Sequence, residues 1–427
     1  MTFIVNPTNY LRGRCCLPAS KSYSIRAFII AACGGRSEIF APSDCDDAKV
    51  ALSVAMQLGA KVKRVRKDHW EITAKAKKSN LTRINVGESG TALRFILPLL
   101  PLFTEEAEVL GEGTLQGRPN HHLTKVLRQQ GVDIRGRGDK ESVPISLSGG
   151  TLRGGTITID GSLSSQFISA LLIACPQVLS DTRIAIKGRK LVSQDYIQMT
   201  QSILKKSGVV VKKVNPRLYK VSGGQKFKGL KKFTVPSDYG LAAFLLAAGA
   251  LVDSDLVFQG SLKDDLVQAD ARILGLLKKM GVRFTRTTKS LKIKGPFQLR
   301  GGEFSLKDCP DLVPIISVLA LFAKGKTRLY DIKHARVKES DRISDLRKEL
   351  LKVGAKISEK SNELTIYPRE QYRSNILLDP HSDHRLAMSF CVLGLKIGTR
   401  VKDIGCVAKS YPGFVKDFKK IGAKIDK

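Results

Sequence analysis

The stretch KKMGVRFTR, residues 278–286, is the end of an amphipathic run that meets a glycine and then alternates apolar with polar side chains. A glycine in this position is typical of the left-handed residue that closes a helix, and the alternation is typical of an edge strand. The same pattern occurs six times. Its glycines are Gly59, Gly131, Gly208, Gly281, Gly354 and Gly422. The chain is therefore predicted to repeat a unit of helix, glycine and strand.

The spacing of these glycines sets the size of the unit. Successive glycines lie 72, 77, 73, 73 and 68 residues apart, which leaves room for a second helix and further strands. The apolar stretches SSQFISALLIAC (164–175) and PDLVPIISVLALFA (310–323) supply such second helices. Six α+β units fill the chain, and three units in each half predict two similar lobes with a ligand site in the cleft between them. The periodicity leaves open whether the chain passes between the lobes once or twice.

Composition excludes several classes of protein. A chain of 427 residues with 42% hydrophobic residues is not a low-complexity disordered protein. The longest apolar run, residues 239–252, is shorter than the roughly 18 residues of a membrane span, so it predicts a core helix. The N-terminus shows no apolar segment before a small-residue cleavage site, and we expect a cytoplasmic protein without a secretory signal.

The cysteines and histidines do not predict a metal centre. The eight cysteines are scattered without a C-x-x-C pair. Of the six histidines, His121 and His122 are adjacent, and His381 and His384 are three residues apart. Neither pair has a nearby cysteine or an i, i+4 partner, as a zinc site would require. We expect buried free thiols and no metal.

The net charge of +33 admits two interpretations, binding of nucleic acid or binding of a small anion in a chain that is basic for other reasons. The basic stretches 61–67 and 209–214 mix Lys and Arg with Val, as half-exposed strands do, and lack the aromatic interleaving of an RNA-binding sheet. Solvated strand faces are therefore favoured.

Two motifs in the first half place cations at helix starts. SKSYSIRA (20–27) brings Lys21, Ser22 and Arg26 to the beginning of an apolar helix, where backbone N–H groups also point outward. GESGTALR (87–94) is a glycine-rich turn before a helix that carries Arg94, and Arg118 precedes another helix. Both motifs suit a phosphate or carboxylate ligand. An ordinary serine-capped helix explains the first motif equally well, and an ordinary glycine-rich turn without a ligand is favoured for the second when it is taken alone.

Further motifs supply neutral polar and titrating groups. SLSSQF (162–167) and LVSQDY (191–196) offer hydroxyl and amide groups to a polyol, with serine capping as the alternative. The C-terminal half concentrates carboxylates beside cations, an arrangement suited to general acid–base chemistry, although a solvated helix start with i, i+4 pairs fits as well. These residues are Asp308, Asp311, Lys338, Glu339, Arg342, Asp383, His384, Arg385 and Lys409.

The order and wording of these segments resemble the 5-enolpyruvylshikimate-3-phosphate synthase family across essentially the whole chain. LPASKSYSIRA (17–27) is similar to the family's P-x-S-K-S-x-x-x-R-A, and GTALR (90–94) to its G-T-x-x-R. The R-P pair at 118–119, SSQF, DCPD, RVKESDR, DHRLAM and GCVAKSYPGF follow in the expected order.

The resemblance implies a two-lobed α/β enolpyruvyl transferase fold of six βαβαββ units, an inside-out α/β barrel with three units per lobe. The expected N-terminal lobe is 20–235, and the C-terminal lobe is 1–19 with 236–427. It also implies transfer of the enolpyruvyl group of phosphoenolpyruvate to the 5-hydroxyl of shikimate-3-phosphate, through a tetrahedral intermediate, with release of phosphate. No metal or organic cofactor is implied, a monomer is expected, and glyphosate is expected to occupy the phosphoenolpyruvate space.

The resemblance assigns residues one by one. Positions that hold shikimate-3-phosphate match Lys21, Ser22, Arg26, Ser164, Ser165, Gln166, Ser193, Tyr196, Asp311 and Lys338. Positions that hold phosphoenolpyruvate match Lys21, Gly90, Arg94, Arg118, Gln166, Arg342, Arg385 and Lys409. Proton transfer is implied for Lys21, Asp311 and Glu339. Two substrates with several negative charges require such a cage of Arg and Lys.

Some positions depart from the family pattern. Glu88 and His334 stand where Asn is common, and Tyr239 with Gly240 replaces small residues after Asp238. Glu88 either pairs with a basic neighbour or weakens substrate binding. Two alternatives to the main interpretation remain. One is the UDP-N-acetylglucosamine enolpyruvyl transferase, whose reactive Cys is missing from GEGTLQGRP (111–119), and the other is a basic nucleic-acid-binding protein on an inactive scaffold.

Overall fold

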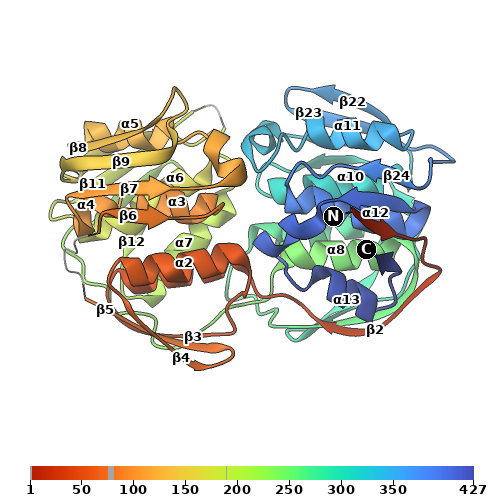
Figure 1. Cartoon of the computed structure of the whole chain (residues 1–427), viewed down its shortest axis with the longest axis horizontal. Helices are drawn as coiled ribbons and strands as arrows, with labels where there is room; N and C mark the ends of the chain where they lie inside the picture. Colours follow the sequence, from red (N-terminus) through yellow and green to blue (C-terminus); the bar gives the residue numbers. More distant parts are fainter. Residues whose placement is uncertain (1, 76–80, 189) are drawn as a thin grey trace. The chain divides into compact units, whose positions relative to one another are not determined.

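The structure is a computed structural model that describes residues 2–75, 81–188 and 190–427. Figure 1 shows the whole chain, which divides into two compact units. Unit 1 combines Met1–Pro18 with Pro236–Lys427, and unit 2 is Ala19–Val235. The chain therefore passes from one unit to the other twice, a number that the periodicity left open. The predicted ligand site between two lobes stays a prediction.

Six four-stranded sheets in the described part of the chain share one order: a parallel pair, followed by two antiparallel pairings. In unit 2 the strand orders are β14–β3–β5–β4, β6–β7–β9–β8 and β10–β11–β13–β12. The bounds of these strands are β3 (Gly35–Phe40), β4 (Lys61–Arg66), β5 (His69–Ala74), β6 (Arg83–Asn85), β7 (Glu106–Leu110), β8 (Val132–Arg137), β9 (Ser142–Gly150), β10 (Gly155–Asp160), β11 (Thr182–Lys187), β12 (Val211–Asn215), β13 (Leu218–Val221) and β14 (Phe233–Thr234). In unit 1 the strand orders are β2–β15–β17–β16, β19–β21–β23–β22 and β24–β25–β1–β26. The bounds of these strands are β1 (Thr2–Val5), β2 (Tyr10–Cys16), β15 (Asp253–Gln259), β16 (Phe284–Arg286), β17 (Ser290–Ile293), β19 (Glu303–Ser305), β21 (Thr327–Tyr330), β22 (Lys356–Lys360), β23 (Glu363–Tyr367), β24 (Ile376–Leu378), β25 (Thr399–Lys402) and β26 (Ile425–Asp426).

Three of these sheets are completed by strands distant in sequence. Strand β14 pairs with β3, and β2 pairs with β15, in parallel. Strand β1 lies between β25 and β26. The N-terminal segment thus completes two sheets of unit 1, which explains why it belongs to that unit.

The prediction made for the repeated glycines is confirmed. All six have positive φ angles, between 84° and 103°. Each follows an amphipathic helix, and the strand after it, β4, β8, β12, β16, β22 or β26, is the edge strand of its sheet. These helices are α2 (Asp46–Gln57), α5 (His121–Gln129), α7 (Gln194–Lys206), α9 (Arg272–Lys279), α11 (Ser344–Lys352) and α13 (Phe414–Lys420). The left-handed turn that glycine permits redirects the chain from the helix into the edge strand.

Apart from the short helix α4 (Leu100–Phe103), the other helices form the core of each unit. In unit 2 they are α1 (Lys21–Ala32), α3 (Gly90–Ile96) and α6 (Ser165–Ala174), and in unit 1 they are α8 (Tyr239–Leu251), α10 (Val313–Leu321) and α12 (His384–Ile397). Every residue of α8 and α10 is buried, so the predicted core helix at 239–252 is confirmed. Within unit 1, α8, α10 and α12 pack against one another (Figure 1).

Two predictions about exposure are partly wrong. All eight cysteines are free, but Cys16 is exposed and Cys406 is partly exposed. Cys16 is exposed because it follows the buried Cys15 along β2, where successive side chains point to opposite faces. Strands β4 and β12 are exposed along most of their length rather than half-exposed, since both are edge strands. No helix among the described residues is long and apolar enough to cross a membrane.

Candidate active site

Several of the predicted site residues lie at the N-termini of five of the six core helices. Helix α1 begins at Lys21, α3 at Gly90, α6 at Ser165 and α12 at His384, and Asp311 lies in the 3-10 turn Pro310–Leu312 that leads into α10. Helix N-termini carry unpaired backbone N–H groups and partial positive charge, which favour anions. The serine-capping alternative also holds, since Ser20, Ser89 and Ser164 each accept a backbone N–H of their own helix. Capping and ligand binding do not exclude each other here.

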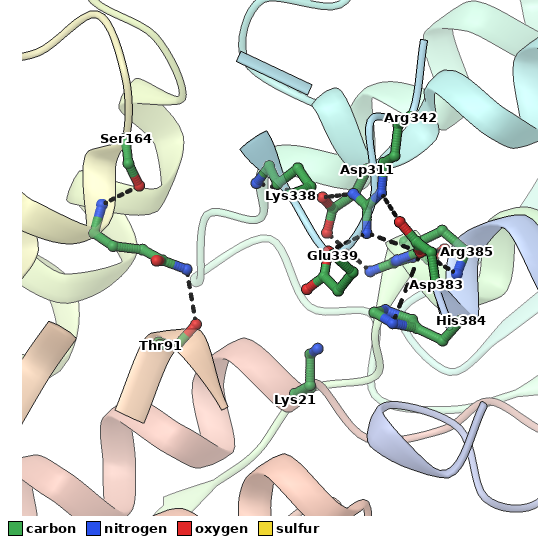
Figure 2. A network of polar contacts seen from close by, with 12 residues as sticks. Lys21, Thr91, Ser164, Asp311, Lys338, Glu339, Arg342, Asp383, His384 and Arg385 are labelled. Atoms are coloured by element: carbon green, nitrogen blue, oxygen red, sulfur yellow. Dashed lines mark hydrogen bonds and ion pairs between the residues drawn. The ribbon is translucent and has the colours of Figure 1, made fainter. Parts of the chain in front are cut away.

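Arg94 is buried and held in place by neutral oxygens of unit 2. Its Nε donates to Oδ1 of Asn120 at 3.0 Å, and Nη2 donates to the carbonyl of Pro119 at 3.2 Å. Its Nη1 donates to Oε1 of Gln166 at 2.9 Å, and Gln166 in turn donates to the hydroxyl of Thr91 at 2.9 Å. Figure 2 shows this last bond, which joins α6 to the start of α3.

Arg118 and Arg94 converge on Gly90. A methyl group built on Gly90 would lie 2.6 Å from Nη1 of Arg94 and 2.7 Å from Nη1 of Arg118. The missing side chain therefore leaves space in front of two guanidinium groups, as an anion site requires. The nearby Glu88 accepts bonds from the backbone N–H and the hydroxyl of Thr114, at 2.9 and 3.1 Å. Those bonds fasten Glu88 to the loop that leads to Arg118.

Arg26 is more deeply buried than the sequence suggested, with 1% of its surface exposed. Its guanidinium donates to the hydroxyl of Thr200 at 2.9 Å and to the carbonyls of Ser22 and Tyr196 at 2.9 and 3.2 Å. Burial lowers the pKa of Arg26 to about 10, which leaves it charged at neutral pH. Arg26 thus anchors the start of α7 against α1. Ser193, the residue before α7, is buried and has a positive φ angle.

Lys21 pairs with a carboxylate that the sequence analysis missed. Its Nζ lies 3.0 Å from Oδ2 of Asp47, in the first turn of α2. Both side chains are mostly buried. The pair fixes the ammonium group at the N-terminus of α1.

In unit 1, Arg342 is the centre of a network of carboxylates. Its Nε lies 2.6 Å from Asp383, its Nη1 2.7 Å from Asp311, and its Nη2 2.6 Å from Glu339. Figure 2 shows the three acids around the one guanidinium, which is 1% exposed. Arg342 therefore fixes the relative positions of Asp311 and Glu339, the two predicted proton-transfer acids of this unit.

Arg385 joins the starts of the three core helices of unit 1. Its Nη1 donates to the carbonyl of Gly240 in α8 at 2.6 Å, and its Nη2 lies 3.2 Å from Oδ2 of Asp311. Arg385 itself is the second residue of α12, whose N-cap Asp383 accepts the Arg385 backbone N–H. Gly240 is suited to this place, because a methyl there would lie 3.0 Å from Nη1 of Arg385 and closer still to the Asp270 carboxylate.

The charges in this network shift one another's pKa values. Burial disfavours the ionised form of Asp311, but Lys338, Arg342 and Arg385 outweigh it and hold the pKa of Asp311 well below its usual range. Burial opposes the charged form of Arg342, yet Asp383, Glu339 and Asp311 raise its pKa well above the ordinary value. Asp311 is therefore a carboxylate at neutral pH, an acceptor rather than a donor of protons.

The remaining predicted residues lie at the edge of this network or apart from it. Nζ of Lys338 is 3.6 Å from Asp311, and Nζ of Lys409 donates to the carbonyl of Ser382 at 3.0 Å. His334 is buried beside Lys338, and burial followed by that charge lowers its pKa to about 3, so the ring is neutral. The sequence motifs gave no signal for Asn120 or Asp47, whose roles depend on contacts distant in sequence.

The described residues hold no group of three or more His, Cys, Asp or Glu side chains that is arranged to bind a metal ion.

Comparison with known proteins identifies relatives of the whole chain. Residues 5–418 match the family model described as EPSP synthase (3-phosphoshikimate 1-carboxyvinyltransferase). Proteins named 3-phosphoshikimate 1-carboxyvinyltransferase from Methanothrix thermoacetophila and Methanococcus aeolicus are 36% and 34% identical, with 97% and 99% of both chains covered. The corresponding protein of Nitrosopumilus maritimus is 33% identical over 97% of both chains.

Solved structures show the same fold. An EPSP synthase from Acinetobacter baumannii has a TM-score of 0.80 at 24% identity, over 100% of this chain and 99% of that one. The enolpyruvyl transferase NikO from Streptomyces tendae has a TM-score of 0.79 at 20% identity, over 100% and 98%. The predicted α/β enolpyruvyl transferase fold is confirmed. Neither alternative function gains support from the relatives.

Proposed function

The chain belongs to the EPSP synthase (3-phosphoshikimate 1-carboxyvinyltransferase) family, and from this premise we propose how its own residues carry out the transfer. The enzyme moves the enolpyruvyl group of phosphoenolpyruvate to the 5-hydroxyl of shikimate-3-phosphate and releases phosphate. A C–O bond forms while the methylene carbon gains a proton, and the second half-reaction removes a proton from that carbon as phosphate leaves.

We assign phosphoenolpyruvate binding in unit 2 to the guanidinium groups in front of Gly90. Arg94 and Arg118 both approach the space that a Gly90 side chain would fill. Guanidinium groups bind carboxylate and phosphate through paired hydrogen bonds. Lys21 and Gln166 complete this set, and Arg342, Arg385 and Lys409 are the cations that unit 1 contributes.

Shikimate-3-phosphate is assigned to hydroxyl, amide and cationic groups of both units. The start of α6 offers Ser164, Ser165 and Gln166, and the start of α7 offers Ser193 and Tyr196. Ser22 and Arg26 belong to α1, and Lys338 lies beside Asp311. Hydroxyl groups that already cap a helix retain lone pairs for a ligand hydroxyl.

Proton transfer is assigned to Asp311, Glu339 and Lys21. Asp311 is ionised, because its pKa lies well below the usual range, and we assign it to accept the 5-hydroxyl proton. Glu339 and Lys21 are assigned to the two proton transfers at the methylene carbon, which gains a proton in the first half-reaction and loses one in the second. The single observation that carries this proposal is the bonding of both Asp311 and Glu339 to one buried guanidinium, Arg342.

Phosphate release tests the function directly. Release that requires both shikimate-3-phosphate and phosphoenolpyruvate, and stops when either is omitted, is the expected result. Phosphate release from phosphoenolpyruvate alone would contradict the proposed acceptor.

We also propose that the enzyme works as a monomer in the cytoplasm. Eight free cysteines support a reducing compartment. Chromatography with light scattering tests the monomer, and a molar mass near 46.8 kDa is expected.

A further inference from the structure

The outward face of the sheet β10–β11–β13–β12 carries a row of three cations. Arg183 on β11 lies directly opposite Lys220 on β13, and Lys220 lies directly opposite Lys212 on the edge strand β12. All three side chains are exposed. With neighbouring strands about 4.8 Å apart, the row spans roughly 10 Å.

No other four-stranded sheet in the described residues has such a row. In the sheet of β4, Lys63 lies opposite Glu71, and in the sheet of β22, Lys360 lies opposite Glu363. Elsewhere a cation faces an acid or a neutral residue across the strands, as Arg135 faces Ser146. The three-cation row is therefore a property of one sheet and not of the basic composition as a whole.

Like charges directly opposite one another on neighbouring strands destabilise a sheet. Among the residues that the structure describes, Arg183, Lys212 and Lys220 form no ion pair with a carboxylate. Asp181, the nearest acid along the chain, accepts the backbone N–H of Gly223 at 3.0 Å. Asp181 is one acid against three cations, so the row keeps a net positive charge.

The three cations also line one hollow. It has a volume of about 430 Å³, and the rest of its lining is Asp181, Thr182, Val210, Val221, Ser222 and Gln225. The Gln225 amide bonds to both the N–H and the carbonyl of Val210, at 2.8 and 3.0 Å, and this fixes the wall. A volume of this size is typical of small-molecule sites. A surface that only attracts ions from solution needs no such hollow.

We propose that this hollow is a second anion site, separate from the residues assigned to the reaction, for a small molecule that carries two or more phosphate groups. A single phosphate is shorter than the row and leaves part of the repulsion in place. An extended polyphosphate brings one anionic group to each cation, with Arg183 able to bind in the paired geometry that guanidinium and phosphate favour.

Inorganic tripolyphosphate is the probe for calorimetric titration of the whole protein. Lys212→Gln and Lys220→Gln should each weaken one class of tripolyphosphate site by about tenfold or more, with phosphate release unchanged. Lys63→Gln is the matched control, because Lys63 is also an exposed lysine on an edge strand of unit 2 but faces an acid. Tripolyphosphate that enters the substrate site binds these variants alike, so only the difference between them reports on the sheet.

The thermal stability without ligand gives an independent readout. Lys220→Gln removes the central repulsion and should raise the melting temperature by roughly 1–3 °C, whereas Lys63→Gln should not raise it. Equal tripolyphosphate titrations of wild type and Lys220→Gln, or an equal loss in Lys63→Gln, would overturn the site. Inorganic phosphate or citrate bound as tightly as tripolyphosphate would overturn its assignment to a molecule with several phosphates.

Discussion

The two units hold the arginines of the candidate site in different ways. In unit 2, the guanidinium groups of Arg26 and Arg94 are fixed by hydroxyl, amide and carbonyl oxygens. In unit 1, Arg342 is surrounded by three carboxylates, and Arg385 contacts one of them. Neutral acceptors position a cation without cancelling its charge, whereas carboxylates cancel it. Unit 2 therefore retains positive charge for an anionic substrate, and unit 1 forms a balanced network suited to moving a proton.

This contrast leads to a separation of effects. Substitutions of the carboxylates in the network of unit 1 should lower turnover with little loss of phosphoenolpyruvate binding. Substitutions of the unit 2 arginines that neutral oxygens hold should instead weaken phosphoenolpyruvate binding more than they lower turnover. Variants that mix the two effects would contradict the division.

The largest expected effect is that of Asp311→Asn. The amide keeps the shape of the side chain but removes the proton acceptor, and kcat should fall by about 10³ or more. Phosphoenolpyruvate binding should be retained or tightened, because Arg342, Arg385 and Lys338 lose a counter-charge. Single-turnover rates and equilibrium titration of phosphoenolpyruvate measure the two effects separately. A variant with near-normal turnover would remove Asp311 from the chemistry.

Glu339→Gln should have the next largest effect, a fall in kcat of about 10² with phosphoenolpyruvate binding largely intact. Glu363→Gln is the matched control, since Glu363 is also paired with an arginine, Arg328, but belongs to β23 and not to the network. It should turn over normally. Wild-type turnover of Glu339→Gln would make the proton-transfer assignment wrong.

Arg94→Lys tests unit 2. Lysine keeps the charge but cannot bond to Asn120, Pro119 and Gln166 together, so the KM for phosphoenolpyruvate should rise by about tenfold to a hundredfold while kcat changes less. Arg64→Lys, on an exposed strand of the same unit, is the control and should change neither constant. A fall in kcat alone would assign Arg94 to the proton-moving part of the site.

The sequence predicted the fold well where the signal was local. A glycine with positive φ at the end of an amphipathic helix depends on its immediate neighbours, and all six glycines behaved as expected. The site was predicted through the family resemblance, because helix capping explained the same serines. Asn120 and Asp47 were missed since each meets its arginine or lysine partner 26 residues away, a contact that only the packing of helices creates.

Gly90→Ala should have a smaller effect that differs between two ligands. The methyl would lie 2.6 Å from Nη1 of Arg94 and 2.7 Å from Nη1 of Arg118, so both guanidinium groups would have to move away from Gly90. We expect the wild type to be inhibited by glyphosate in competition with phosphoenolpyruvate. Glyphosate is longer than phosphoenolpyruvate, so its inhibition constant should rise more in the variant than the KM for phosphoenolpyruvate does. The difference between the two changes should be several-fold, up to about tenfold. Equal inhibition constants in variant and wild type would show that Gly90 does not border the inhibitor.

The smallest effect on turnover is expected for His334→Asn, which acts on the stability of unit 1. His334 is buried against Lys338, with Asp311 and Asp331 also acting on it, and its folded pKa of about 3 lies below its ordinary value of 6.5. Between these two values the unfolded chain binds a proton that the folded chain does not, so the free energy of unfolding falls as the pH is lowered from 6.5 towards 3. At pH 5 the wild type should have lost about 2 kcal/mol from this group, and the variant should not show that loss.

Urea unfolding of both proteins at pH 7.5 and pH 5 measures the effect as a difference of differences, in which any packing change caused by the substitution cancels. Turnover at pH 7.5 should be unchanged, because the neutral ring carries no charge into the Arg342 network. If wild type and variant lose equal stability between the two pH values, His334 is protonated in the folded protein at pH 5. Its charge would then add to that of Lys338 beside Asp311, and the balance of charges that distinguishes unit 1 from unit 2 would hold only near neutral pH.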